Sequence, residues 1–231
     1  MKDLFPHSKA VFTAIAIAMA AAVFLVSGQV AKWTTHGSPV WVNQAVLKGS
    51  IIVLSLAAMR ALRLGRKESG FAMPSAPWRL KAALGLAAGA GATWSLLLTG
   101  SPPNPVVAGM SVGALVLWVF LFSSISEEVL CRGLLQSMLA EVDARIAISA
   151  LFFGAMHLSL FLRGAPASTV LILVFWTSVL GWLAALLRDR TGSLLPPVIA
   201  HIAFNFGGAI GGAIYVIAYR VTTGTLPPIL R

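Results

Sequence analysis

Long apolar segments recur along the whole chain, and their lengths predict a membrane protein. Seven qualify as spans, at about residues 10–31, 40–64, 80–99, 106–125, 145–162, 168–187 and 194–219, and the fourth can continue as a helix to about residue 140. A helix needs about 20 apolar residues to cross a bilayer, so this chain can hold about six to eight. The predicted fold class is all-α: a polytopic transmembrane helical bundle that forms one integral membrane domain over residues 1–231.

The composition excludes a soluble domain and a disordered chain. Hydrophobic residues make up 58% of the sequence and charged residues only 10%, whereas an ordinary soluble domain has about 25% charged residues. So few charges cannot cover a soluble surface, and the abundant apolar surface argues against disorder. The single cysteine, Cys131, excludes an intrachain disulfide and a CxxC metal site.

The net charge of +10 indicates a membrane topology rather than a nucleic-acid partner, because Lys and Arg collect in cytoplasmic loops and face anionic lipid there. With seven spans and a cytoplasmic N-terminus, 12 of the 17 basic residues fall on the inner side. The five outer ones are Lys32, Lys48, Arg163, Arg220 and Arg231. This split predicts an inner N-terminus and an outer C-terminus, with the first segment retained as an anchor.

Glycines spaced four residues apart predict close contacts between spans. The seventh segment contains Gly207 and Gly211, overlapped by Gly208 and Gly212, and the third contains Gly85 and Gly89. Such GxxxG patterns allow the backbones of two helices to approach closely in lipid.

Three places within the spans carry ionisable side chains: Glu127, Glu128 and Arg132 in the fourth, His157 in the fifth, and His201 with Asn205 nearby in the seventh. A charge near the bilayer centre costs at least about 2.5–3.5 kcal/mol by insertion scales, so such residues need a partner or a function. The alternative for the first group is that the fourth helix ends near Ser126 and leaves all three charges solvated.

Helical spacing separates the two glutamates. Glu128 and Arg132 are four residues apart, so they share one face and can form an ion pair. Glu127 lies about 100° away around the helix, which makes it the better candidate for an available carboxylate. Phe153 with His157, and His201 with Asn205, are also four residues apart. At about 1.5 Å per residue, Glu127 and both histidines can meet in the cytoplasmic half of the membrane.

A carboxylate and two imidazoles that converge indicate hydrolysis. The carboxylate can take a proton from water, the imidazoles can orient that water, and an asparagine amide can donate to an oxyanion. Glu127, His157 and His201 are also a possible ligand set for a divalent metal such as zinc. A structural role is the commoner one for any single buried histidine. The sequence does not contain the HExxH motif of zinc proteases.

Three motifs resemble one known family. Glu127-Glu128-Val-Leu-Cys-Arg132 resembles the EExxxR motif of the CAAX protease and bacteriocin-processing (CPBP, or Abi) intramembrane proteases, Phe153-Gly-Ala-Met-His157 their FxxxH motif, and His201-Ile-Ala-Phe-Asn205 their HxxxN motif. The resemblance covers about residues 106–219, which we take as the motif-bearing protease core. It implies a multi-helix fold with an active site inside the bilayer that opens to the cytoplasm.

The resemblance also implies roles and partners. Glu127 would activate water, His157 would assist, and His201 and Asn205 would hold the oxyanion or help to bind a metal, with Glu128, Arg132 and Phe153 as support. The substrate would be a membrane-associated protein or peptide. The compact, alanine-rich chain favours a bacterial inner-membrane member, whose relatives process peptides, confer bacteriocin immunity or cleave sorting signals. Two alternatives stay open: a non-proteolytic immunity or peptide-binding factor of the same fold, and a transporter with a Glu/His proton relay.

Overall fold

The computed structural model describes residues 9–75, 80–97 and 110–227, and its helices agree with the predicted spans. Within these residues, seven helical spans are long and apolar enough to cross a membrane: Lys9–Thr34, Val40–Ala61, Leu80–Leu97, Val112–Met138, Arg145–Leu162, Ala167–Thr191 and Leu195–Thr223. The predicted start of the fourth span, at residue 106, lies outside the described residues. The all-α fold class is confirmed.

Five spans consist of one uninterrupted helix, and two are composite. The uninterrupted helices are α1 (Lys9–Thr34), α2 (Val40–Ala61), α3 (Leu80–Leu97), α8 (Ala167–Thr191) and α9 (Leu195–Thr223). The fifth span joins α7 (Arg145–Met156) to a 3-10 stretch, η3 (His157–Arg163). The fourth runs through α4 (Val112–Ala114), η1 (Leu115–Phe122), α5 (Ser123–Glu128), η2 (Val129–Leu135) and α6 (Gln136–Met138), with η1 and η2 wound as π-helix. Such π-helical turns are rare and are found frequently at functional sites.

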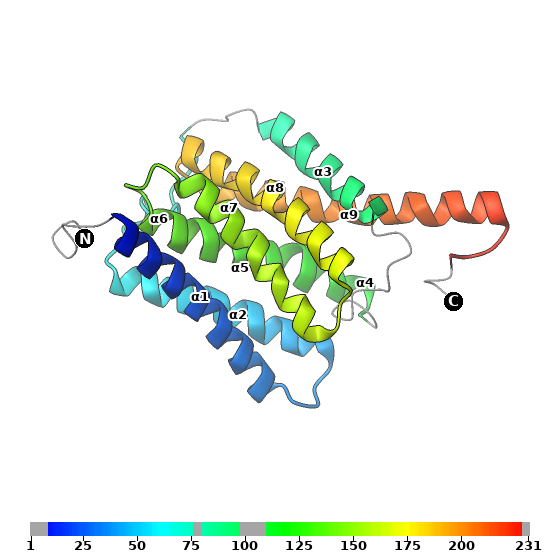
Figure 1. The fold of residues 1–231 in the computed structure, drawn as a ribbon, viewed down its shortest axis with the longest axis horizontal. Coiled ribbons are helices and arrows are strands. Elements are labelled where there is room, and N and C mark those ends of the chain that lie inside the picture. Colours follow the sequence, from blue (N-terminus) through cyan, green and yellow to red (C-terminus); the bar gives the residue numbers. More distant parts are fainter. Residues whose placement is uncertain (1–8, 76–79, 98–109, 228–231) are drawn as a thin grey trace.

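The fourth span lies at the centre of the bundle. Every residue of η2 is buried, and this stretch contacts α1, α2, α7 and α8, while α5 contacts α2 and α9. Figure 1 shows α1 and α2 paired on one side of this span and α3 and α9 on the other, with the C-terminal part of α9 extending beyond the remaining helices. The two motif glutamates are therefore carried by the most enclosed helix.

Small residues bring α9 against α3. A Cβ atom at Gly207 would lie 2.1 Å from the carbonyl oxygen of Ala88, and one at Gly211 would also meet the α3 backbone. The predicted close contact of the seventh span is thus confirmed. The expectation for the third span is wrong, because nothing lies within 4 Å of a Cβ placed at Gly85 or Gly89.

A second close approach joins α7 to α8 and was not predicted. A Cβ at Gly154 would lie 2.0 Å from the hydroxyl oxygen of Ser178, and one at Gly181 would lie 3.0 Å from the carbonyl oxygen of Ala150. Gly154 follows Phe153 directly in the sequence. This contact therefore fixes the position of Phe153 inside the bundle.

The loop after α2 is tied to the connection between α8 and α9. Phe71 and Ser193 form an isolated antiparallel bridge, and the backbone N–H of Leu194 donates to the carbonyl of Gly70 at 2.8 Å. The Arg188 guanidinium donates to the carbonyl of Glu68 at 2.5 Å. These bonds hold the loop after α2 against the end of α8 and the start of α9.

Candidate active site

The two motif glutamates are buried side chains of α5, not solvated charges at a helix end. Glu128 is 0% exposed and Glu127 is 7% exposed. The helix continues past them to Met138, which removes the alternative in which the fourth span ends near Ser126. Both carboxylates need partners at this depth, and each obtains them from a different set of helices.

Glu128 is enclosed between Arg132 and His201. Its Oε2 lies 3.2 Å from Nε of Arg132, so the predicted ion pair is confirmed. The second guanidinium nitrogen, Nη2, donates to the carbonyl of Gly181 on α8 at 2.5 Å. Oε1 of Glu128 lies 2.9 Å from Nδ1 of His201. Glu128 therefore also positions an imidazole, a contact that its spacing from Arg132 did not predict.

Glu127 faces another direction and is paired as well. Its Oε1 accepts hydrogen bonds from Nζ of Lys48 at 2.7 Å and from the hydroxyl of Ser123 at 2.5 Å. Its Oε2 lies 3.9 Å from Nε2 of His201, which is too long for a hydrogen bond. Glu127 is thus available through one oxygen only, and the sequence did not show that the other is occupied.

Lys48 is the functional residue that sequence reasoning misplaced. It was counted among the outer basic residues, but it lies within α2 and is only 8% exposed. Gln44 and Ser55 are buried on the same helix. Without Lys48 and the buried Arg132, the predicted split of basic residues becomes 11 inner to four outer, which preserves its direction. A lysine within an apolar segment is the signal that could have revealed it.

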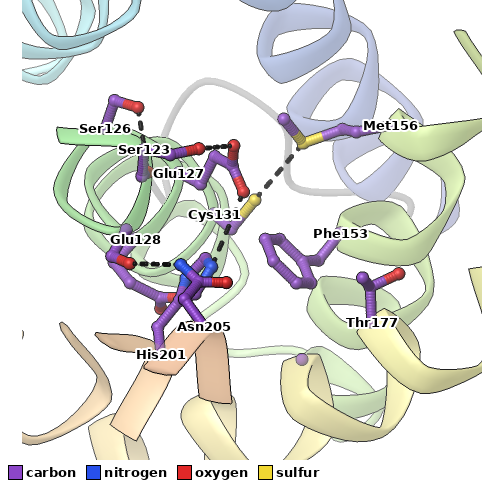
Figure 2. A network of polar contacts seen from close by, with 12 residues as sticks. Ser123, Ser126, Glu127, Glu128, Cys131, Phe153, Met156, Thr177, His201 and Asn205 are labelled. Atoms are coloured by element: carbon purple, nitrogen blue, oxygen red, sulfur yellow. Dashed lines mark hydrogen bonds and ion pairs between the residues drawn. The ribbon is translucent and has the colours of Figure 1, made fainter. Parts of the chain in front are cut away.

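Phe153 lies between the two motif histidines. Its ring is edge-on to the ring of His157, with centroids 5.4 Å apart, and to that of His201 at 5.3 Å. The Arg132 guanidinium carbon lies 4.9 Å from the centroid of the same ring. Figure 2 shows Phe153 facing the helix that carries the glutamates, with His201 close to Glu128. The ring holds the two imidazoles apart and contacts the buried cation.

Hydrogen bonds determine which nitrogen of each histidine carries the proton in its neutral form. Nδ1 of His201 faces the Glu128 carboxylate, an acceptor when ionised, so Nδ1 is the donor and Nε2 the acceptor. Nδ1 of His157 lies 3.0 Å from the carbonyl oxygen of Phe153, which gives the same assignment. Each neutral imidazole therefore presents an acceptor nitrogen for chemistry.

Asn205 is attached to α5 through a serine. Its Nδ2 donates to the hydroxyl of Ser124 at 3.1 Å, and that hydroxyl donates to the carbonyl of Phe120 at 2.6 Å. The predicted shared face of His201 and Asn205 is borne out by these bonds, because both reach α5. Sequence reasoning missed Ser123 and Ser124, although hydroxyl residues just before two glutamates in an apolar segment are a readable signal.

The predicted metal set of Glu127, His157 and His201 stays a prediction, and the arrangement around Glu127 gives it little support. Lys48 places an ammonium 2.7 Å from Glu127, where it already neutralises the carboxylate. Within the described residues, no group of three or more His, Cys, Asp or Glu side chains could hold a metal ion. We therefore derive no catalytic step through a metal.

The fold and the buried cluster define an integral membrane protein of the helical-bundle class, with two carboxylates and the imidazole of His201 enclosed at its centre. Residues 109–207 match the model of a family described as type II CAAX prenyl endopeptidase Rce1-like. The match confirms the family resemblance of the three motifs, all of which lie within the matched segment. It supports proteolytic activity in general. No curated protein and no solved structure matches the chain.

Proposed function

We propose that this protein is an intramembrane endopeptidase that hydrolyses a peptide bond near the terminus of a membrane-associated protein or peptide. One observation carries the proposal: Oε2 of Glu127 and Nε2 of His201, both proton acceptors, face each other at 3.9 Å inside the bundle. The family match supports the same class of reaction.

The separation of these two atoms suits a water molecule that bonds to both of them. Polar atoms separated by more than about 3.5 Å are commonly bridged in this way. The water would donate one proton toward Glu127 and the other toward His201, which leaves an oxygen lone pair directed at the substrate. Glu127 then acts as general base, a contribution typically worth about 10²–10⁴-fold in rate.

His201 is held for this role by Glu128. A carboxylate at Nδ1 fixes the ring orientation and keeps Nε2 as the acceptor, as in catalytic triads. This assignment differs from the oxyanion role implied by the resemblance, because a neutral His201 has no proton at Nε2 to donate. His201 therefore orients the water, and Glu128 is its positioning residue.

His157 and Asn205 complete the set. One N–H of the Asn205 amide is used by Ser124, and the second is available to the substrate carbonyl oxygen. Nε2 of His157 can accept a hydrogen bond from the water or from the departing amine. The ring of Phe153 contacts both His157 and His201, so His157 belongs to the same site.

The reaction balances with these groups alone. Water oxygen bonds to the carbonyl carbon as one water proton moves to Glu127, and the carbonyl π electrons move onto oxygen. The C–N bond then breaks, the electron pair returns to form the acid carbonyl, and Glu127 gives its proton to the amine nitrogen. The products are a new carboxyl terminus and a free amine.

Membrane orientation is part of the proposal: the N-terminus lies in the cytoplasm and the C-terminus outside, in a bacterial inner membrane. The basic residues inside the bundle do not change the direction of the split that supports it. A periplasmic-active reporter should be active after Arg231 and silent in the loop between α2 and α3. The reverse pattern would overturn the orientation and leave the chemistry unaffected.

The main test compares membrane proteins from cells that make the wild type, Glu127→Gln or Glu141→Gln, a control at an exposed glutamate. Mass spectrometry should find one shortened terminus with the wild type and the control, and the full-length terminus with Glu127→Gln. Identical termini in all three would refute a protease. A peptide that binds the purified protein and stays intact would instead indicate a non-proteolytic binding factor.

Purified protein in detergent then defines the substrate class. We would incubate it with a CAAX-terminated peptide, with and without a farnesyl group, and with a peptide that spans the terminus found in cells. Cleavage only of the farnesylated peptide would assign a prenyl-dependent enzyme. Equal cleavage with and without the lipid would assign a peptide-directed one.

A further inference from the structure

The fourth-span carboxylate Glu127 is paired with a cation from a distant part of the chain. Lys48 lies on α2, outside the segment that matches the family model, and its Nζ lies 2.7 Å from Oε1 of Glu127. The two residues are 79 positions apart in the sequence. We propose that Lys48 is a further catalytic residue, whose ammonium donates a hydrogen bond to the oxyanion formed when water attacks the substrate. This inference rests on the proposed hydrolytic function.

The other groups at the site leave the oxyanion short of donors. His201 and His157 each use their Nδ1 proton elsewhere and present an acceptor at Nε2 when neutral. The Ser123 hydroxyl donates to Glu127. Among these residues, Asn205 offers one remaining N–H, so a second donor has to come from elsewhere.

Of the two cations in the cluster, Lys48 is the one that a substrate can reach. Arg132 is 0% exposed and is bound to Glu128 and to the Gly181 carbonyl. Lys48 retains a small exposed area, and an ammonium has three protons, of which Glu127 takes one. Two N–H groups remain for a ligand beside the reacting carboxylate.

The position of Lys48 also matches the movement of charge during the reaction. In the resting site its positive charge is balanced by the Glu127 carboxylate. When Glu127 takes the water proton it becomes neutral, and one negative charge appears on the substrate oxygen. A small displacement of the ammonium is enough to pair it first with the Glu127 carboxylate and then with the substrate oxyanion. The attacked carbonyl lies about 3 Å from the water, so the two positions are close together. A preorganised donor of this kind is worth most in a water-poor site.

Lys48 takes part in the balanced reaction without exchanging a proton. The ammonium donates a hydrogen bond to the developing oxyanion as the water oxygen joins the carbonyl carbon. It returns to Oε1 of Glu127 after the C–N bond breaks and the amine departs with the proton from Glu127. The residue thus acts on the transition state and not on substrate binding.

Kinetics of four purified proteins test the inference: wild type, Lys48→Met, Lys48→Ala and the control Lys81→Met, which removes an exposed lysine. The substrate is the peptide that the wild type cleaves. We expect Lys48→Met to lower kcat by about 10²–10³-fold, the usual effect of losing one oxyanion donor. KM should stay within about threefold, since the interaction is made only in the transition state. Lys81→Met should match the wild type.

Chemical rescue separates a hydrogen-bond donor from a simple counter-ion. Propylammonium has the three carbons and the ammonium that Lys48→Ala lacks, and it should restore at least tenfold of the lost kcat. Tetramethylammonium has the charge but no N–H group, and it should restore nothing. If Lys48→Met does not fold in detergent, Lys48→Ala, which also lacks the donor, is held to the same kcat criterion.

The outcomes are distinct. Wild-type kcat in Lys48→Met, a loss confined to KM, or equal rescue by tetramethylammonium would each overturn the inference while the proposed function stands. Absence of any Glu127-dependent hydrolysis by the wild type would overturn the proposed function, and the inference with it. Loss of kcat with selective rescue by propylammonium would establish Lys48 as the donor.

Discussion

The two sides of the helix that carries the glutamates differ in what surrounds them. On one side, Glu128 and Arg132 are completely enclosed and bound to α8 and α9. On the other, Glu127 and Lys48 each keep a small exposed area, between α5 and α2. Two carboxylates adjacent in the sequence thus occupy environments suited to different tasks, one to support and one to chemistry.

This difference shows that the burial of a carboxylate does not by itself define its role. Both glutamates have a cationic partner, and both lie near His201. The two glutamates differ in whether a carboxylate oxygen is left without a close partner. Both oxygens of Glu128 face a partner within 3.2 Å. Oε2 of Glu127, in contrast, lies 3.9 Å from Nε2 of His201. Substitutions on the enclosed side should therefore act on folding as well as on turnover, and those on the other side mainly on turnover.

The largest expected effect is that of Glu127→Gln. The amide keeps the size of the side chain but cannot take a proton, so kcat should fall by about 10²–10⁴-fold. Peptide binding measured by fluorescence anisotropy should stay close to that of the wild type. If the Glu127→Gln protein cleaves at the wild-type rate, Glu127 is not the general base and the two sides do not differ in function.

Glu128→Gln should lower stability as well as activity, because Glu128 also holds His201 in position. The substitution leaves the Arg132 charge enclosed without its counter-ion, and breaking one half of a buried pair costs about 3–5 kcal/mol. Thermal unfolding in detergent should show a melting temperature well below that of Glu127→Gln. Equal melting temperatures for Glu128→Gln and the wild type would mean that the enclosed side does not support the fold.

A smaller effect is expected where α7 meets α8 on the enclosed side. Gly154→Ala places a Cβ against the Ser178 hydroxyl and the α8 backbone, and overpacking of this kind costs about 1–3 kcal/mol. Gly85→Ala is the matched control, because its Cβ would enter open space. Alanine there should be neutral or stabilising by up to about 1 kcal/mol. Thermal unfolding of both variants measures the difference. Similar destabilisation by Gly154→Ala and Gly85→Ala would contradict the close contact between α7 and α8.

Cys131→Ser should have the smallest effect on activity. Cys131 is buried beside Met156, with the two sulfur atoms 3.7 Å apart, and its side chain makes no contribution to the proposed chemistry. We expect kcat within about twofold of the wild type and a stability cost of about 1–3 kcal/mol for a buried hydroxyl. A folded Cys131→Ser protein without activity would instead indicate a cysteine nucleophile.

Local relationships were predictable from the sequence, whereas most of the particular residue pairs formed between spans were not. Apolar run lengths located the seven spans, and a spacing of four residues predicted the Glu128–Arg132 pair. The Lys48–Glu127 pair joins two spans far apart in the sequence. Helical periodicity shows which face a side chain occupies but not which helix lies opposite that face.

The glycine patterns show the same limit. Gly85 and Gly89 have the spacing of a helix contact, yet that face of α3 has no neighbour within reach. Gly91, outside the pattern, is the glycine that approaches α9, where a Cβ would meet the Phe204 carbonyl oxygen. Small residues permit a close approach, but the arrangement of the whole bundle decides which of them makes one.

The distance in sequence between Lys48 and its partner has a consequence for how the protein enters the membrane. Ribosomes add about 5–20 residues per second, so Glu127 is made roughly 4–16 s after Lys48, given the 79 positions between them. During that interval α2 has to be inserted with an ammonium that lacks its carboxylate, at a cost of about 2.5–3.5 kcal/mol near the bilayer centre. The second span is therefore only marginally stable in lipid until the fourth has been translated and placed beside it.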